Sequence, residues 1–470
     1  MLLATLLKGL IWSAAIPVGQ GPDEPSQVAL VQFIAEQHRL PQAEEIYRAD
    51  ELVHMRRLAQ SGLIEGERNV QQEFSDTQMG PNEKEILVLD SEMRVSFDSH
   101  AYVSAMFVPP LYHWLASLPY RLFYSADVLS RVFSMRLASV LLTMGFVWVS
   151  YWVARESFPQ RPLLWRTVPI VTSFQPMVTF IGSVVNSDML LFLLLGIATW
   201  LVIRALRRNF TWQVAAGLGV VTGLGLLTKP MILGYGLGLA IVLLILWLKK
   251  RQPWWKLALY SLLIPAIALI ISGWFMVRNQ RIQGAPLYDN PYDNPHIVER
   301  FNPKPDLTIQ AYWQDVFKDQ LENSIFRSYW GNFGWLDTPM PDRVYESLRW
   351  VSRLAYLEIG LFIIISLRRQ VVDWNTLWVL VVLVVLSLSL LLPMFGRAYI
   401  IARDTGIAGS SAQGRYLLGM WAAQATVLVF GLTAVVTEEA QKFVHGLISL
   451  SVIALNVIAF AAVLIPRYYL

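Results

Sequence analysis

Residues 1–25, MLLATLLKGLIWSAAIPVGQGPDEP, join an apolar segment directly to the acidic dipeptide Asp23-Glu24. The run from Met1 to Val18 is apolar enough to cross a membrane, although Lys8 interrupts it. Two adjacent carboxylates at the boundary of such a segment are costly unless water, a cation or a substrate satisfies them. The acidic pair is therefore the first candidate for a functional site.

The N-terminal segment must be distinguished from a secretory signal peptide, which would be removed. A signal peptide ends in a small-residue cleavage site. No clear small-x-small site precedes Pro22, and Lys8 lies inside the apolar run. We therefore expect residues 1–19 to form a retained first membrane helix.

The composition of the whole chain is that of a polytopic membrane protein. Its 470 residues are 55% hydrophobic and 15% charged, whereas a soluble domain carries about 25% charged residues. The mean hydropathy is +0.45, and the 18 Trp, 18 Tyr and 22 Phe fit the preference of aromatic side chains for membrane interfaces. The absence of cysteine excludes disulfides and thiolate metal sites. We attribute the net charge of +4 to cytoplasmic anchoring residues rather than to nucleic-acid binding.

About eleven stretches are long enough to span a bilayer, which takes roughly 17–25 apolar residues. They fall near 1–19, 128–154, 163–181, 186–206, 211–228, 230–248, 256–277, 350–367, 374–393, 415–437 and 442–466. A further stretch at 101–124 contains Pro109-Pro110, Pro119, His113 and Arg121, which suit an interfacial helix better than a span. The sequence therefore predicts an all-α polytopic membrane protein with a single domain over 1–470.

Basic residues indicate the orientation of these spans, because Lys and Arg flank membrane helices on the cytoplasmic side. With the N-terminus in the cytoplasm, the cytoplasmic loops hold thirteen of them: Arg155, Arg161, Arg166, Arg204, Arg207, Arg208, Lys249, Lys250, Arg251, Lys256, Arg368, Arg369 and Lys442. The short outer connections hold only Lys229, Arg397, Arg403 and Arg415. We therefore expect the chain to lie in a plasma membrane with this orientation.

Two long polar segments, 20–127 and 279–349, then lie outside the cell. The first contains two predicted interfacial helices, Gln27 to Arg39, with a broad apolar face, and Pro109 to Tyr124. Between them, 42–100 is charged and weakly patterned, so we expect a mobile or partly helical excursion. The second segment is rich in Pro, Asn, Asp and aromatic residues.

Polar motifs gather on the outer side in this topology. The acidic pair follows the first span, Asn186-Ser187-Asp188 begins another, Thr228-Lys229-Pro230 lies in a tight hairpin, and Gln413-Gly414-Arg415-Tyr416 precedes the tenth span. This convergence predicts an active site that faces outward.

Each motif has a structural alternative. Asp23 is a candidate general base, or else it caps the helix that starts near Gln27. Lys229 is either a snorkelling anchor or a point charge for a lipid phosphate. Arg415 offers a fork to a phosphate, with Gly414 allowing close backbone approach, or it anchors the interface together with Tyr416.

The remaining candidates are weaker. Asn186-Ser187-Asp188 suits a helix cap, although Asp188 is also placed to orient an active-site arginine. The stretch from Phe326 to Pro341, FRSYWGNFGWLDTPMP, includes Trp330 and Trp335. Aromatic rings stack on sugar faces and line lipid grooves, but interfacial packing explains any single ring equally well.

Metal and nucleotide sites have little support. The six histidines, His38, His54, His100, His113, His296 and His445, show no ligand spacing. Asp23, Glu24 and Asp188 suit a hard divalent cation such as Mg or Mn, but nothing demands one. No P-loop, dinucleotide fingerprint or serine nucleophile elbow is present.

In order, these motifs resemble the GT-C superfamily of integral membrane glycosyltransferases. They are Pro22-Asp23-Glu24-Pro25, Pro109-Pro110-Leu111-Tyr112, Arg136-Leu137-Ala138-Ser139, Asn186-Ser187-Asp188, Tyr329-Trp330-Gly331-Asn332-Phe333-Gly334-Trp335 and Gln413-Gly414-Arg415-Tyr416. The chain looks closest to a bacterial family of predicted membrane proteins of unknown function. More distant relatives are the aminoarabinose transferase of lipid A and the protein O-mannosyltransferases.

This resemblance implies a GT-C-like bundle, a polyprenyl-phosphate sugar donor and inverting transfer at the outer membrane face. It maps the catalytic base to Asp23, with Glu24 beside it to hold the acceptor or a metal. It maps the donor phosphate to Arg415 and Lys229. Asp188, Tyr112, His113, Trp330, Trp335 and Tyr416 then become candidates for donor or acceptor binding.

Two positions depart from the related sequences, which often carry His where this chain has Gln27 and Tyr where it has His113. The acceptor is therefore not carried over. A secondary transporter or lipid flippase is the main rival, but its charges would lie near the bilayer midplane, often in repeated halves, and no repeat is evident here. A non-catalytic envelope assembly subunit is the other alternative.

Overall fold

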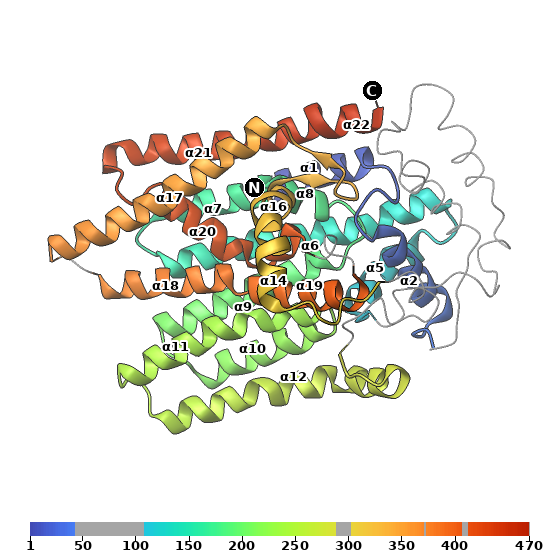
Figure 1. The fold of residues 1–470 in the computed structure, drawn as a ribbon, viewed down its shortest axis with the longest axis horizontal. Coiled ribbons are helices and arrows are strands. Elements are labelled where there is room, and N and C mark those ends of the chain that lie inside the picture. Colours follow the sequence, from blue (N-terminus) through green and yellow to red (C-terminus); the bar gives the residue numbers. More distant parts are fainter. Residues whose placement is uncertain (43–107, 288–301, 371–372, 407–411, 470) are drawn as a thin grey trace.

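The computed structural model describes residues 1–42, 108–287, 302–370, 373–406 and 412–469. Long helices run side by side along the longest axis of the molecule (Figure 1). Among the described residues, strands form only a two-stranded antiparallel sheet, β1 (Asn332–Phe333) with β2 (Thr338–Pro339). The predicted all-α polytopic membrane fold is confirmed.

Seven helical segments in the described part are long and apolar enough to cross a membrane. They are α6 (Val128–Ser157), α9 (Asp188–Arg207), η2 with α11 (Pro230–Tyr235 and Gly236–Leu248), α12 (Trp254–Gln283), α17 (Asp342–Arg368), α18 with α19 (Trp374–Leu388 and Leu391–Thr405), and α21 with η6 and α22 (Glu438–Ile458, Ala459–Leu464 and Ile465–Tyr469). The other predicted spans are shorter helices, α1 (Leu2–Ala15) and α10 (Trp212–Leu226), or broken ones, α7 with α8 (Pro162–Phe174 and Pro176–Ile181) and η5 with α20 (Gly414–Met420 and Trp421–Gly431).

The centre of the bundle is α9, whose most apolar window is 78% buried, against 17% for α17 and 22% for α12. A helix that is apolar all round and enclosed by others belongs in a core, whereas an apolar helix that is mostly exposed faces lipid. The first residue of α9, Asp188, therefore opens the most enclosed helix of the fold.

Lys8 has a structural partner inside the membrane bundle. Helix α7 ends before Pro176, and its last carbonyl groups have no partner within the helix. The Lys8 ammonium donates to the carbonyl oxygen of Ser173 and, at 2.7 Å, to the hydroxyl of Thr179, while the Asn456 amide donates to Phe174 O at 3.1 Å. The lysine that interrupts the first apolar run thus closes a break in a neighbouring helix.

The two predicted helices of the first outer segment are present as α2 (Glu24–Gln37) and α5 (Leu111–Leu122). Helix α2 is more enclosed than a helix lying on the surface, because every residue from Gln27 to Ala35 is buried. Most of the predicted excursion at 42–100 lies outside the described residues.

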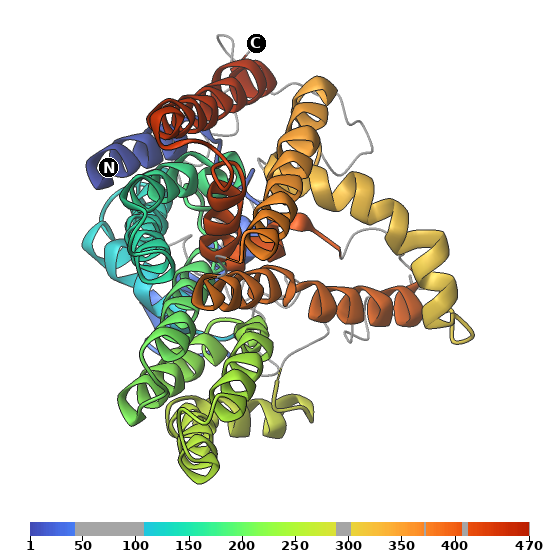
Figure 2. The ribbon, with the colours of Figure 1, turned by 90° about the vertical axis from the view of Figure 1, so that its left-hand side faces the viewer.

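The second outer segment contains a helical rod where the sequence pattern indicates a loop. Its pieces are α14 (Ile309–Tyr312), η3 (Trp313–Phe317), α15 (Lys318–Gln320), η4 (Leu321–Ile325) and α16 (Phe326–Trp330). In the end-on view of Figure 2, this rod and α19 lie across the bundle and extend from it to one side. Phe317 packs against Phe395 of α19 with ring centroids 4.8 Å apart. The predicted span 374–393 is split between two helices, because α18 ends at Leu388 and α19 begins at Leu391.

Arg136 in α6 fixes the end of α1. It is fully buried, and its Nη1 donates to the carbonyl oxygens of Ser13 and Ile16 at 2.7 and 2.6 Å. Its Nη2 donates to Pro17 O at 3.1 Å and to Glu24 Oε2 at 2.7 Å, and its Nε donates to Glu24 Oε1 at 2.8 Å. All five guanidinium N–H groups have an acceptor, as a buried arginine requires.

We expect Arg136→Met to lower the free energy of unfolding by about 3–5 kcal/mol, because it leaves the Glu24 carboxylate buried without its cation. Thermal unfolding in detergent, followed by tryptophan fluorescence, measures this. Arg155→Met provides the control, since Arg155 is exposed on the same helix and its change should move the midpoint little. Equal midpoints for the two variants would contradict the anchoring role of Arg136.

Candidate active site

Asp23 occupies the N-cap position of α2, but its side chain makes no capping hydrogen bond. Its backbone is left-handed, with φ 63°, a conformation that Asp tolerates better than most residues. The carboxylate instead accepts a hydrogen bond from Arg415 Nη2, with Oδ2 2.8 Å away. Asp23 keeps 51% of its side-chain surface exposed, against 2% for Arg415. The helix-cap alternative for this carboxylate is therefore wrong.

Glu24 is fully buried, in contrast to its neighbour. Besides its two bonds from Arg136, it accepts from the amides of Gly19 at 2.9 Å, Gly21 at 3.4 Å and Val185 at 2.9 Å. Five donors thus surround its two oxygens. We predicted that Glu24 holds an acceptor or a metal, but this geometry assigns it a different part, because it binds the loop that carries Asp23 to α6 and to the segment before α9.

Arg415 uses only some of its hydrogen-bond donors. Its Nη2 contacts Asp23 and, at 3.3 Å, the Tyr416 hydroxyl. Its Nε and Nη1 are buried and have no hydrogen-bond partner in the described part of the chain. A buried guanidinium with open N–H groups is costly unless an anion or water meets them. The unpaired Nε–H and Nη1–H groups therefore make Arg415 a candidate anion-binding residue.

Two more cations lie around the ring of Tyr416. The guanidinium of Arg415 is 5.1 Å from the ring centroid, the Lys229 ammonium 5.6 Å and the Arg397 guanidinium 6.0 Å. Such distances favour cation–π attraction. Tyr416 thus gathers cations from the hairpin after α10, from α19 and from η5.

Lys229 forms an ion pair with Asp188 Oδ1. Asp188 is 1% exposed, and its Oδ2 has no partner among the described residues. The sequence predicts that Asp188 orients an active-site arginine; its direct partner is Lys229, and its charge also acts on Arg415. Asn186 supplies the local turn at the start of α9, because its Oδ1 accepts from the Asp188 amide at 2.8 Å and its Nδ2 donates to Pro22 O at 2.9 Å.

The charges of this site sum to a net positive charge. Arg415, Lys229 and Arg397 are opposed by Asp23 and Asp188, which leaves one net positive charge. Arg397 has no ion-pair partner in the described ranges. Burial raises the pKa of Asp23, but Arg415, Lys229 and Arg397 outweigh it, so the pKa lies below its ordinary value of 3.8. Asp23 is therefore ionised at neutral pH.

Tyr112 and His113 are fully buried. The Tyr112 hydroxyl contacts Ser139 Oγ at 2.7 Å and accepts from the Asn186 amide at 2.9 Å, which ties α5 to α6 and to the start of α9. His113 Nε2 contacts Gln27 Oε1 at 2.7 Å. Burial lowers the pKa of His113 to about 3, so its ring is neutral. The two positions that depart from the related sequences are thus in direct contact. Both Tyr112 and His113 are therefore enclosed by protein, in contrast to the half-exposed Asp23.

The two predicted tryptophans differ in exposure. Trp330 is 5% exposed and packs against Trp421 with ring centroids 5.6 Å apart, so it is a packing residue. Trp335 is 41% exposed and donates to Gly19 O at 3.1 Å, beside the loop that Glu24 holds. Gly414 approaches protein backbone rather than open space, because a Cβ atom there would collide with Ile325 O and Tyr329 N.

No group of three or more acidic or histidine side chains that could hold a metal ion occurs within the described ranges. The three carboxylates considered for a divalent cation are each paired with a protein cation: Glu24 with Arg136, Asp188 with Lys229 and Asp23 with Arg415.

Sequence reasoning missed two residues of the site. Arg136 is one of two arginines, with Arg131, inside the apolar stretch 128–154, where an arginine requires a buried partner. Arg397 is one of the four basic residues in the short predicted outer connections. The small number of basic residues in these connections was the feature that could have marked it as a site candidate.

The chain belongs to the family of predicted membrane proteins DUF2142, whose model matches residues 6–424. The predicted membership of a family of uncharacterised membrane proteins is confirmed. A search of curated proteins found no match. Similar solved structures include ArnT from Cupriavidus metallidurans bound to undecaprenyl phosphate, at 13% identity and TM-score 0.49, covering 96% of this chain and 62% of that one. Apo ArnT gives 13% identity and TM-score 0.48, with coverages of 94% and 60%. This chain thus spans about three fifths of the length of those proteins.

Proposed function

We propose that this member of the DUF2142 family transfers a sugar from a polyprenyl-phosphate donor to an acceptor hydroxyl on the outer face of a prokaryotic plasma membrane, with inversion. The observation that carries the proposal is the half-exposed Asp23 carboxylate beside Arg415, whose remaining donors are open. This reaction uses a base at the acceptor hydroxyl and a cation at the departing phosphate, and Asp23 and Arg415 are groups of these two kinds.

Asp23 acts as the base in this proposal. Its carboxylate is ionised and accessible, so it can accept the proton of an acceptor hydroxyl as the oxygen attacks the sugar. The pair with Arg415 lowers its pKa and makes it a weak base in the empty site. When a donor phosphate engages Arg415, its negative charge offsets the guanidinium, and the proton affinity of Asp23 rises.

Arg415, Lys229 and Arg397 bind the donor phosphate. The unpaired Nε–H and Nη1–H groups of Arg415 can each donate to a phosphate oxygen. The net positive charge of the site matches a donor phosphate that carries one negative charge. When the bond to the sugar breaks, the departing phosphate gains a second charge, and fixed cations stabilise that change.

The enclosed groups position this machinery. Glu24 holds the loop before Asp23, Asp188 holds Lys229, and Tyr416 keeps the three cations together. Trp335, with its exposed ring near Gly19, offers a face on which a sugar can stack.

A transporter or flippase would move the lipid-linked sugar without breaking it, and a non-catalytic subunit would leave it unchanged. Purified protein incubated with a panel of polyprenyl-phosphate sugars and candidate acceptors separates these classes. Release of polyprenyl phosphate together with glycosylated acceptor supports the enzyme, whereas intact donor throughout, in detergent and in vesicles, contradicts it.

We expect Asp23→Asn to reduce transfer by about 10²–10⁴-fold, because the amide cannot take the acceptor proton. Release of polyprenyl phosphate measures the rate, and the thermal midpoint verifies folding. Asp306→Asn is the matched control, since Asp306 is an exposed carboxylate in the second outer segment. A rate within twofold of wild type for Asp23→Asn would remove the base assignment.

Arg397→Gln should weaken binding of undecaprenyl phosphate by about fivefold, the effect of one cation near a lipid phosphate. Binding is measured by native mass spectrometry with the lipid alone, so the result does not depend on the acceptor. Arg403→Gln serves as control, because Arg403 pairs with Asp404 further along α19. Equal affinity of the two variants would exclude Arg397 from the phosphate site.

The pH dependence follows from the lowered pKa of Asp23. Because its ionised form is favoured in the folded protein, its contribution to stability is complete above pH 3.8 and is lost as pH falls through the lower folded value. The rate should therefore show no acid limb from Asp23 between about pH 5 and 8. In Lys229→Gln, which removes one cation acting on Asp23, the acid limb of kcat/KM should move to higher pH. A limb that stays in place or moves down would contradict this coupling.

A further inference from the structure

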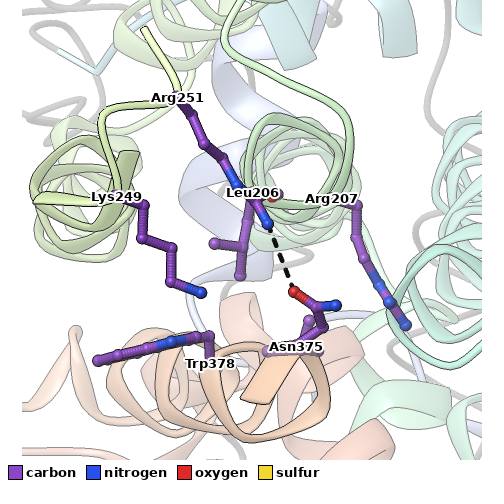
Figure 3. Close-up of a pocket in the computed structure, with 7 residues that line it drawn as sticks. Leu206, Arg207, Lys249, Arg251, Asn375 and Trp378 are labelled. Carbon is purple, nitrogen blue, oxygen red and sulfur yellow. Dashed lines mark hydrogen bonds between the residues drawn. The ribbon is translucent and has the colours of Figure 1, made fainter. Parts of the chain in front are cut away.

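A second charged pocket lies at the opposite end of α9 from Asp188. It has a volume of about 90 Å³ and is lined by Leu206, Arg207, Lys249, Arg251, Asn375, Trp378 and Val379 (Figure 3). These residues come from the end of α9, the loop after α11 and the start of α18. Since α9 has 20 residues, at about 1.5 Å each the pocket is about 30 Å from Asp188.

Three cations border this pocket, and two of them lack a counter-ion. Arg251 donates to Leu206 O at 3.1 Å and to Asn375 Oδ1 at 3.4 Å. The Lys249 ammonium lies 5.5 Å from the centroid of the Trp378 ring, as Figure 3 shows. Neither Lys249 nor Arg251 forms an ion pair within the described ranges.

The balance of charge around the pocket favours an anion. Arg207 binds the carbonyl oxygens of Glu156 and Ser157 at the end of α6, and the nearby carboxylates of Asp373 and Glu156 act on Arg207. Burial, followed by the charge of Arg251, lowers the pKa of Lys249. An anion between Lys249 and Arg251 would relieve this repulsion.

Tryptophans place the pocket at the level of lipid headgroups. Trp247, Trp254, Trp255 and Trp374, at the ends of the helices that border it, are 54%, 69%, 51% and 57% exposed. Exposed tryptophans concentrate at membrane interfaces. The distance of about 30 Å from the candidate active site equals the thickness of a bilayer's hydrocarbon core.

We propose that this pocket binds the phosphate of an anionic phospholipid from the leaflet opposite the candidate active site. Its volume suits a phosphate group and is well below the roughly 300 Å³ at which pockets for small molecules begin. Basic pockets between membrane helices bind such headgroups. The bound lipid links α9, α11 and α18 at their shared end. The proposal does not depend on the reaction proposed above.

Native mass spectrometry of the full chain in detergent tests it, with dioleoylphosphatidylglycerol, dioleoylphosphatidylcholine and inorganic phosphate as separate probes. We expect one phosphatidylglycerol to bind preferentially. Lys249→Gln should weaken it about fivefold and the double variant Lys249→Gln/Arg251→Gln about 25-fold, by one factor of five per cation. Lys442→Gln, an exposed lysine at the start of α21, should leave the affinity unchanged.

Equal binding of the two phospholipids, or unchanged affinity in the double variant, would overturn the proposal. Inorganic phosphate that binds as tightly and displaces the lipid would identify a free-phosphate site and overturn the lipid assignment. Because Arg251 also holds the end of α9, the double variant is at risk of misfolding. Lys249→Gln alone then decides, since the Lys249 ammonium contacts only a ring face among the described residues.

Discussion

The buried pair of Glu24 and Arg136 is the interaction on which the rest of this site depends. Burying two charges is costly unless each is fully hydrogen-bonded, and here the guanidinium uses all five donors while the carboxylate accepts five bonds. The acceptors and donors come from the end of α1, from α6 and from the segment before α9. One ion pair therefore joins three parts of the chain that are remote in sequence, and this junction fixes the position of the preceding residue, Asp23.

Two adjacent carboxylates thus serve opposite purposes because their surroundings differ. Glu24 is neutralised and enclosed, whereas Asp23 projects towards cations and remains open on one side. The same contrast recurs among the cations. Arg136 is completely satisfied, but Arg415 keeps buried N–H groups without a described partner. Polar groups whose hydrogen bonds are all made hold the framework in place. Polar groups that still lack a partner are the ones that a phosphate or an acceptor can bind most favourably.

Hydropathy predicted the helices well because each span is a local property of about 20 residues. The nearness of Asp23 and Arg415 also followed from topology, since both lie on one side of the predicted bundle. Topology did not predict that Asp23 is exposed while Glu24 is buried, because this difference depends on Arg136, more than a hundred positions away. Tyr112, His113 and Trp330 were likewise assigned to binding by residue type, although burial set by distant neighbours makes them supports. The rod from α14 to α16 escaped prediction because its wide turns break the usual helical period of its apolar residues.

Gly414 connects the rod from α14 to α16 with the charged residues around Arg415. The amide of Gly414 donates to Ser328 Oγ at 2.8 Å, and there is no room for a Cβ atom between this backbone and α16 with the turn before it. Arg415 is the next residue. A tilt of the rod that projects sideways in Figure 2 would therefore be transmitted through rigid backbone contact to the arginine. The position of the rod and the position of Arg415 are therefore tied to each other by this one close backbone contact.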